Sequence, residues 1–479
     1  MYILLFIGYS LLCIYGIIKV PFVRRSEIRP AFLVLFFALH VAAGLVHNII
    51  AYRYYPGHGD IWNFYQWSFI YRHRLFSDFS LFLENNASLT YFTHNGIIGI
   101  QMFLNIFSFN SLTINTLLFS FPVFLGNIAL FRLFRRRLPR APLAAFTVFL
   151  LPSTLFWTSC IHREGVLYML LGFLLYSFDR LLARQPDQPI HIRPRRTHIL
   201  IFFMSFILLL YFRFSIALSL LPALGAWWLA ERSFPRRRLL IFTGVGLSLL
   251  IILILTLPGF FHSLATGITF RQKEFSGLEG HSRLPLPEMD GTWRSIGSVL
   301  PAAVRNGGFE PLPGNGGQKI YLFFSLELLL IWAIIAITLV RSLTSRASAG
   351  LRPSSLLARS LRSARKRSAR EPSQAATAHP SSSNPPVRPI ASDLPAHPSS
   401  SNPPVRPFVT FCLLFSLSGL LLIGAIVPFA GAIVRYRSIF LPFLLAPALY
   451  GIRTTPFCSK INTWITRRLT TSGENTLSH

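Results

Sequence analysis

Three ionisable residues stand together between two apolar segments of the chain. His162, Arg163 and Glu164 follow LPSTLFWTSC (residues 151–160), and a second apolar segment begins at once. Ionisable groups beside hydrocarbon are costly, so such a group indicates a functional site by default. Glu164 falls near the N-terminus of the next predicted helix, where the helix dipole favours an ionised carboxylate that could serve as a base. The alternative is a tight interhelical turn with Glu164 as its N-terminal cap.

A second carboxylate, Asp60, follows Pro56-Gly57-His58-Gly59 and begins an aromatic-rich segment that extends to Tyr71. A carboxylate in this position can accept a proton from a hydroxyl group, and we expect Asp60 and Glu164 to be the catalytic residues. If the protein uses a metal ion, we expect Mg²⁺ or Mn²⁺ between these two carboxylates. His58 is a substrate-binding candidate. The alternative for Asp60 is an ordinary helix N-cap.

Arginines recur at predicted helix ends, where guanidinium groups can bind phosphate oxygens in a bidentate manner. Arg435 and Arg437 flank one tyrosine after an apolar segment, and Arg213 lies between two short apolar segments. We expect these three arginines, with His162 and Arg163, to bind substrate. The alternative is that each long side chain reaches from the membrane to the polar interface.

The composition predicts that membrane-spanning helices position these residues. Of 479 residues, 52% are hydrophobic and 13% are charged, whereas soluble domains have about 25% charged residues. Too little polar surface is available for a soluble enzyme, a disulfide-rich scaffold or a disordered chain. Cys13, Cys160, Cys412 and Cys458 form no C-x-x-C pair, so neither a zinc site nor a disulfide framework is predicted.

We therefore predict an all-α, polytopic membrane helical bundle with about eleven spans. The net charge of +29 comes from basic residues in short loops, which indicates cytoplasmic loops and not nucleic-acid binding. This rule places the N-terminus outside and the C-terminus inside. The span that contains Glu327 has an acidic residue with no partner that the sequence identifies. The predicted spans are residues 2–18, 31–50, 111–131, 141–160, 165–183, 199–212, 214–230, 239–257, 320–340, 408–428 and 438–452.

The predicted domain organisation has three parts. Residues 1–340 form a membrane domain with two long extracytoplasmic loops, 51–95 and 258–318, and the Gly- and Pro-rich second loop is expected to have an irregular backbone. Residues 341–407 are a basic, Pro- and Ser-rich cytoplasmic linker, in which AHPSSSNPPVRP occurs twice, and we expect it to be disordered. Residues 408–479 form a C-terminal membrane hairpin and a basic tail.

This layout resembles the GT-C superfamily of integral-membrane glycosyltransferases, which includes the protein mannosyltransferases. Asp60 in the first outer loop, Glu164 after a Pro-containing helix and the late Arg435-Tyr436-Arg437 run carry the resemblance. The family implies a polyprenyl-phosphate sugar donor within the membrane, arginines at its phosphate and a carboxylate that deprotonates the acceptor.

Two other functions are compatible with the same residues: an O-antigen-type polymerase or ligase, and a transporter or flippase of lipid-linked sugars. Absence of an internal repeat between the two halves of the sequence argues against the transporter. Arg-rich loops and the lack of a targeting signal are typical of a multi-pass protein of the bacterial inner membrane.

Overall fold

The computed structural model describes residues 1–54, 60–77, 80, 89–183, 192–232, 258–278, 282–313, 319–350 and 405–471. All regular secondary structure within these ranges is helical. The chain divides into two compact units, one of residues 1–335 with 403–479 and the other of residues 336–402. Every predicted site residue that the structure describes belongs to the first unit.

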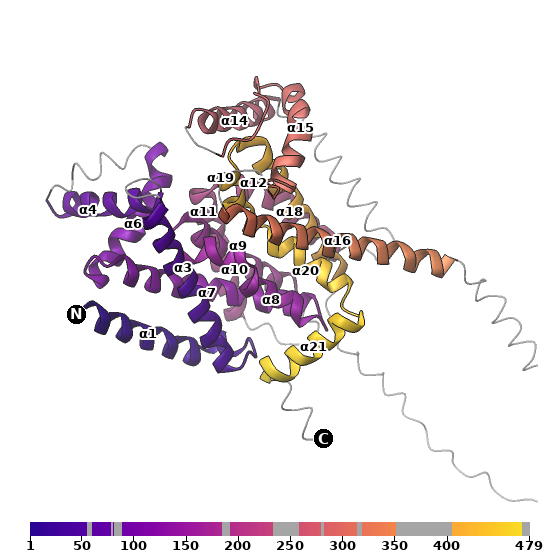
Figure 1. Ribbon diagram of the computed structural model, residues 1–479, viewed down its shortest axis with the longest axis horizontal. Coiled ribbons are helices and arrows are strands. Elements are labelled where there is room, and N and C mark those ends of the chain that lie inside the picture. Colours follow the sequence, from indigo (N-terminus) through magenta and orange to yellow (C-terminus); the bar gives the residue numbers. More distant parts are fainter. Residues whose placement is uncertain are drawn as a thin grey trace, which may run out of the picture. The chain divides into compact units, whose positions relative to one another are not determined.

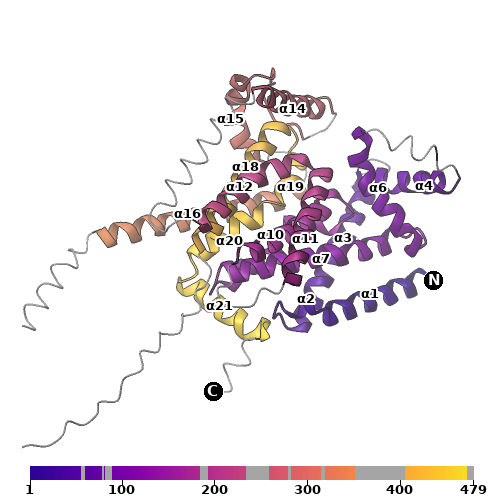
Figure 2. The same cartoon turned by 180° about the vertical axis from the view of Figure 1, so that it is seen from behind.

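Figures 1 and 2 show the helices from two opposite sides. In chain order they are α1 (Tyr2–Lys19), α2 (Pro21–Arg24), α3 (Pro30–Tyr54), α4 (Asp60–Ser77), α6 (Leu89–Ser108), α7 (Leu112–Arg137), α8 (Pro142–Leu150), α9 (Pro152–Ser159), α10 (Arg163–Leu182), α11 (Ile192–Phe212), α12 (Phe214–Arg232), α14 (Pro258–Ser276), α15 (Trp293–Gly308), α16 (Lys319–Gly350), α18 (Val405–Ile426), α19 (Ala430–Arg437), α20 (Leu441–Gly451) and α21 (Pro456–Leu469).

Among the described residues, seven helices are long and apolar enough to cross a membrane, or up to nine if each of two bent pairs counts as one span. These helices are compatible with a multi-pass integral membrane protein. The predicted all-α class is confirmed, because all regular secondary structure of the described residues is helical. Helices occupy ten of the eleven predicted spans. The remaining one, residues 239–257, lies outside the described residues.

Both bent pairs have a proline beside the bend. Helix α8 ends at Leu150, and α9 starts at Pro152 with its axis turned by 45°. Proline lacks the backbone N–H that would continue the α8 hydrogen bonds. Helices α19 and α20 meet at 58°, and Pro442 occupies the first turn of α20. The two bends approach each other, since the Thr154 hydroxyl donates to the Ser438 carbonyl at 2.7 Å.

One sequence prediction requires correction. The second long loop, 258–318, is not irregular throughout, because α14 and α15 lie within it. Ten of its seventeen glycines and prolines lie at 284–291 and 307–317. The segment between them contains Gly297 and Pro301 but is amphipathic, and it starts with the N-cap Thr292, which accepts from Ser295 N. Helix α16 extends to Gly350, into the first residues of the predicted linker 341–407. Residues 351–404 lie outside the described residues.

The core of the first unit centres on α7 and α10, which pack closely together. A Cβ on Gly172 would lie 2.2 Å from the Gly126 carbonyl oxygen, and a Cβ on Gly126 would lie 2.5 Å from the Met169 Cα. These glycines therefore set the distance between the two helix backbones. Phenylalanines of other helices pack in the same core, as when Phe36 of α3 stacks on Phe149 of α8 with ring centroids 5.1 Å apart.

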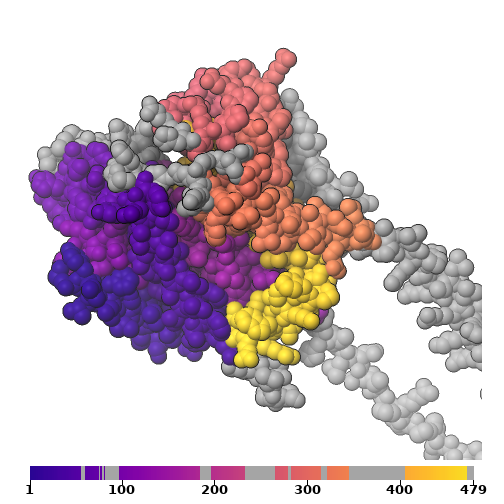
Figure 3. All heavy atoms as spheres, viewed as in Figure 1, coloured from indigo at the N-terminus to yellow at the C-terminus, as the bar shows by residue number. Residues whose placement is uncertain are grey.

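The chain segments near both termini meet on one face (Figure 3). Arg29 N donates to the Leu469 carbonyl at 2.9 Å, and Thr471 N donates to the Glu27 carbonyl at the same distance. Glu27 also forms a 2.5 Å ion pair with Arg135 at the end of α7. Backbone bonds thus join the α2–α3 connection to α21.

Gly172→Val should destabilise the protein, because the new side chain would overlap the Gly126 backbone. Overpacking of this kind costs about 1–3 kcal/mol or more. Gly225→Val is the matched control, since a Cβ at Gly225 of α12 meets no atom within 4 Å. We expect a lower thermal unfolding midpoint in detergent for Gly172→Val and an unchanged midpoint for the control. Equal midpoints would contradict the close packing of α7 and α10.

Candidate functional site

Four separate segments bring their charged residues together in what we call the arginine–carboxylate cluster: Asp60, Glu164, Arg213 and Arg435. Asp60 begins α4, and Glu164 lies in the first turn of α10. Arg213 is the single residue between α11 and α12, and Arg435 lies in the last turn of α19. Each residue is at a helix end or between two helices, where the side chain is not confined to a helix–helix contact.

Arg435 binds both carboxylates of the cluster. Its Nη1 lies 2.5 Å from Asp60 Oδ2, and its Nε lies 3.4 Å from Glu164 Oε1. Arg213 Nη1 lies 3.2 Å from the same Glu164 oxygen. Asp60 and Glu164, predicted from distant parts of the sequence, therefore face one guanidinium group. Their exposure differs, because the side chain of Asp60 is 43% exposed and that of Glu164 is 2% exposed.

Tyr436 organises the two arginines and was not among the predicted site residues. The Arg213 guanidinium lies 3.6 Å from the centroid of the buried Tyr436 ring, and that of Arg435 lies 4.8 Å from it. Arg435 Nη2 also donates to the Tyr436 hydroxyl at 2.9 Å. Cation–π contacts of this kind orient guanidinium groups. The position of this tyrosine between Arg435 and Arg437 was the available sequence signal.

The backbone around Glu164 is held by a close contact between α9 and α10. A Cβ on Gly165 would lie 2.6 Å from the Thr158 carbonyl oxygen, so no larger residue fits without a shift. Cys160 and His162 have extended backbone conformations, which reverse the chain between the two helices. Glycine and the short turn together place Glu164 at the buried end of α10.

Electrostatics distinguish the titratable groups outside the spanning helices. Burial opposes ionisation of Asp60, but the charges of Arg435 and His162 and the Arg435 hydrogen bond outweigh it, so its pKa lies well below its usual range. Burial and the charge of Arg435 lower the pKa of His162 to about 4, although Glu164 and Asp60 oppose this shift. Asp60 is therefore ionised and His162 neutral near pH 7.

The other predicted site residues have different environments. Arg163 lies close enough to Arg213, Glu164 and Asp60 to interact with them electrostatically. Arg437 is buried, and its Nη1 donates to the Glu310 carbonyl at 2.7 Å; within the described residues it forms no hydrogen bond or ion pair with the cluster.

Two further candidates lie apart from the cluster or cannot be placed. His58 lies outside the described residues. Glu327, whose partner could not be predicted from the sequence, accepts the backbone N–H of Ser153 with both oxygens, at 3.2 and 3.1 Å. It therefore binds the N-terminus of α9 at the bend between α8 and α9.

The carboxylate pair does not fit a Mg²⁺ or Mn²⁺ site in this arrangement. Such ions take oxygen ligands that converge on one point. Here the Arg435 guanidinium faces both Asp60 and Glu164, and Arg213 neutralises Glu164 further. We assign no divalent cation to this pair.

No protein-family model matches the chain, and no curated protein or solved structure is significantly similar to it. The chemistry of the arginine–carboxylate cluster therefore has to be inferred from its own residues.

Arg435→Gln should lower the free energy of unfolding by about 2–3 kcal/mol, because it removes a partner from the buried Glu164. The loss is smaller than for a fully isolated charge, since Arg213 still pairs with Glu164. Arg271→Gln is the control, because Arg271 is 64% exposed in its ion pair with Glu274 and should contribute less than about 0.5 kcal/mol. Thermal unfolding in detergent measures both changes. Equal effects would contradict a special role for Arg435 in stability.

The Asp60 ion pair should make stability pH-dependent in one direction. Since the pKa of Asp60 is depressed in the folded protein, the unfolded state takes up a proton first, near its ordinary pKa of about 3.9. The stability difference between wild type and Asp60→Asn should be constant near pH 7 and decrease as the pH falls below about 4. Because Asp60 is partly exposed, we expect a difference of about 1 kcal/mol. A difference that grows on acidification would contradict the pairing.

Proposed function

We propose that the protein is an integral-membrane glycosyltransferase that transfers a sugar from a polyprenyl-phosphate donor to a hydroxyl acceptor. The acceptor is a lipid, a glycan or a protein. One observation carries the proposal: two carboxylates of unequal exposure, Asp60 and Glu164, converge on the arginines Arg213 and Arg435. A partly exposed carboxylate beside cationic groups suits a reaction with a hydroxyl nucleophile and a phosphate leaving group.

We infer an eleven-span topology in a bacterial inner membrane, with the arginine–carboxylate cluster on the extracytoplasmic side. The basic loops support this orientation under the positive-inside rule. Nucleotide sugars are cytoplasmic, so an extracytoplasmic transferase needs a donor that the membrane delivers. A polyprenyl chain between helices would meet this need, and the many exposed apolar residues of the candidate spans offer it a surface.

The charge in and around the cluster favours an anionic donor. The two arginines and two carboxylates of the cluster balance each other, and the neighbouring Arg163 adds one positive charge. Arg213 and Arg435 are 17% and 19% exposed, so both are within reach of a ligand. A phosphate that binds Arg435 competes with Asp60 for the same guanidinium. Donor binding would thus free the Asp60 carboxylate when the acceptor needs a base.

The reaction then follows from the two environments. Asp60 takes the proton of the acceptor hydroxyl, and the acceptor oxygen attacks the anomeric carbon from the side opposite the phosphate. The bond between that carbon and the phosphate oxygen breaks, and its electron pair leaves with the polyprenyl phosphate, which Arg213 and Arg435 stabilise. The configuration of the sugar is inverted. Glu164 remains buried and acts as a positioning residue for both arginines.

The test is a transfer assay with the purified full-length protein, radiolabelled polyprenyl-phosphate sugars and a membrane extract as acceptor. Asp60→Asn should lower kcat by about 100-fold or more, because the amide cannot accept the proton of the acceptor hydroxyl. Glu164→Gln should also lower the rate, together with the thermal midpoint, since it releases the arginines. Glu27→Gln is the control, because Glu27 pairs with Arg135 in a different part of the described structure.

If transfer persists in both Asp60→Asn and Glu164→Gln, the protein is still a glycosyltransferase, but the arginine–carboxylate cluster is not its catalytic site. If no donor supports transfer and lipid-linked sugar crosses the membrane of proteoliposomes, the proposed glycosyltransferase function is wrong and the protein is a transporter.

A further inference from the structure

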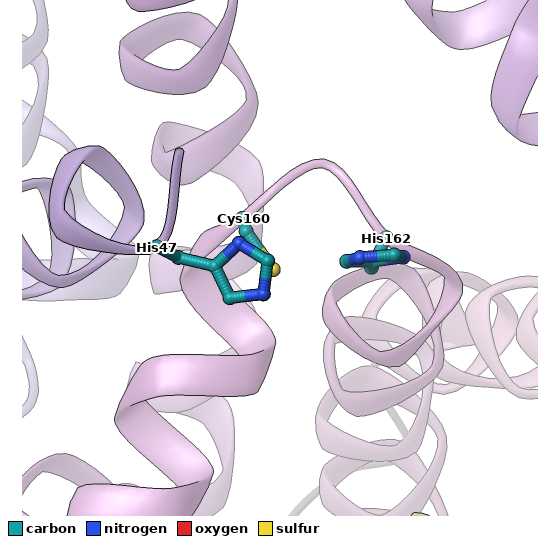
Figure 4. Close-up of side chains that lie close together, drawn as sticks. All are labelled: His47, Cys160 and His162. Carbon is teal, nitrogen blue, oxygen red and sulfur yellow. The ribbon is translucent and has the colours of Figure 1, made fainter. Parts of the chain in front are cut away.

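Two histidines and a cysteine form a second cluster next to the arginine–carboxylate cluster. His47 lies in α3, whereas Cys160 and His162 lie in the turn between α9 and α10 (Figure 4). One ligand atom from each residue lies within 4.8 Å of the others. All three residues are buried. We call this group the His47–Cys160–His162 cluster.

The cluster is surrounded by aromatic rings, and one of its polar atoms has no hydrogen-bond partner among the described residues. The His47 ring lies 4.6 Å from that of Phe156 and 5.1 Å from that of Trp157, and Phe64 lies 5.9 Å from His162. Nδ1 of His47 has no hydrogen-bond partner among the described residues. The Cys160 thiol makes one weak bond, to the Trp157 carbonyl at 3.4 Å. A buried polar atom without a partner costs about 1–3 kcal/mol, which a ligand would offset.

We propose that His47, Cys160 and His162 bind Zn²⁺. Imidazole nitrogen and thiolate sulfur are the ligands that zinc prefers, and three protein ligands leave a fourth tetrahedral position for a further ligand. Binding joins the metal to the thiolate, and the thiol proton is released to solvent. The proposal does not rest on the glycosyltransferase function.

A small movement would bring the three ligand atoms to the spacing that zinc requires. Zinc bonds of about 2.0–2.3 Å place tetrahedral ligand atoms about 3.3–3.8 Å apart, so the three groups must approach by about 1 Å. The bond from Cys160 to Trp157 is weak and can be exchanged for a metal bond. Cys160 and His162 lie in a non-helical turn, where small changes of dihedral angle suffice.

His40 is a buried histidine of the same helix with which His47 can be compared. It lies two turns before His47 in α3, is equally buried, and has no hydrogen-bond partner at either ring nitrogen among the described residues. No cysteine or second histidine joins it in a three-residue group within the described chain. Packing thus accounts for His40, whereas the convergence of three zinc-type ligands at His47 needs a further reason.

The test uses the full-length protein in detergent, stripped with a chelator and then titrated with Zn²⁺ or with Co²⁺ as a spectroscopic substitute. We expect one Zn²⁺ per chain by elemental analysis and a thiolate-to-cobalt charge-transfer band in the near ultraviolet. Cys160→Ser should remove the band, and His47→Gln should weaken zinc binding at least about 100-fold. The matched controls Cys412→Ser and His40→Gln alter a buried cysteine and a buried histidine elsewhere and should change neither readout.

Absence of both zinc uptake and the charge-transfer band in the wild-type protein would overturn the proposal without any variant. Binding that persists in Cys160→Ser, or that is lost equally in Cys412→Ser, would also overturn it. Since the readouts are stoichiometry and absorption, they are independent of sugar transfer. A zinc-binding protein without transferase activity would contradict the proposed function alone.

Discussion

The ion pairs of Arg435 with Asp60 and Glu164 are the interaction on which the arrangement of the candidate site depends. Arg435 is separated from Asp60 by 375 positions in the chain. The pair therefore joins the start of α4 to the end of α19, and Glu164 joins both to α10. A buried carboxylate such as Glu164 is stable only with a partner, and two arginines share that task here. Loss of this contact would affect the relative positions of three segments at once.

The sequence was sufficient to predict the helices but not their bends. Apolar segments of about 20 residues identify spans because a bilayer demands that length, and helices occur at each predicted span that the structure describes. A hydropathy pattern does not show the direction of a helix axis, so the angles of the bends at Pro152 and before Leu441 could not be predicted from it. The helices α14 and α15 were missed because glycines and prolines within and between them lowered the helical signal of the segment.

The candidate site shows the same limit at the level of single residues. Asp60, Glu164, Arg213 and Arg435 were predicted because charged residues are rare in this chain and costly near a membrane. Residue type alone cannot tell Arg435 from Arg437, although one binds two carboxylates and the other donates to the Glu310 carbonyl. His47 and Cys160 were not predicted, because a single histidine in an apolar helix and a single cysteine after one are not distinctive by themselves. Only the fold brings them together, since His47 is remote in sequence from Cys160 and His162.

The bends connect the fold to the site through the groups that they expose. Where α9 begins after the break, the Ser153 N–H has no helical partner, and the Glu327 carboxylate of α16 accepts it. Thr154 then bonds to Ser438 at the corner between α19 and α20. These contacts hold the two bends together, with Cys160, His162 and Glu164 following one of them and Arg435 preceding the other. A straight α8–α9 span would keep its hydrogen bonds but would direct the turn that follows it elsewhere. The prolines therefore act on the chemistry through geometry.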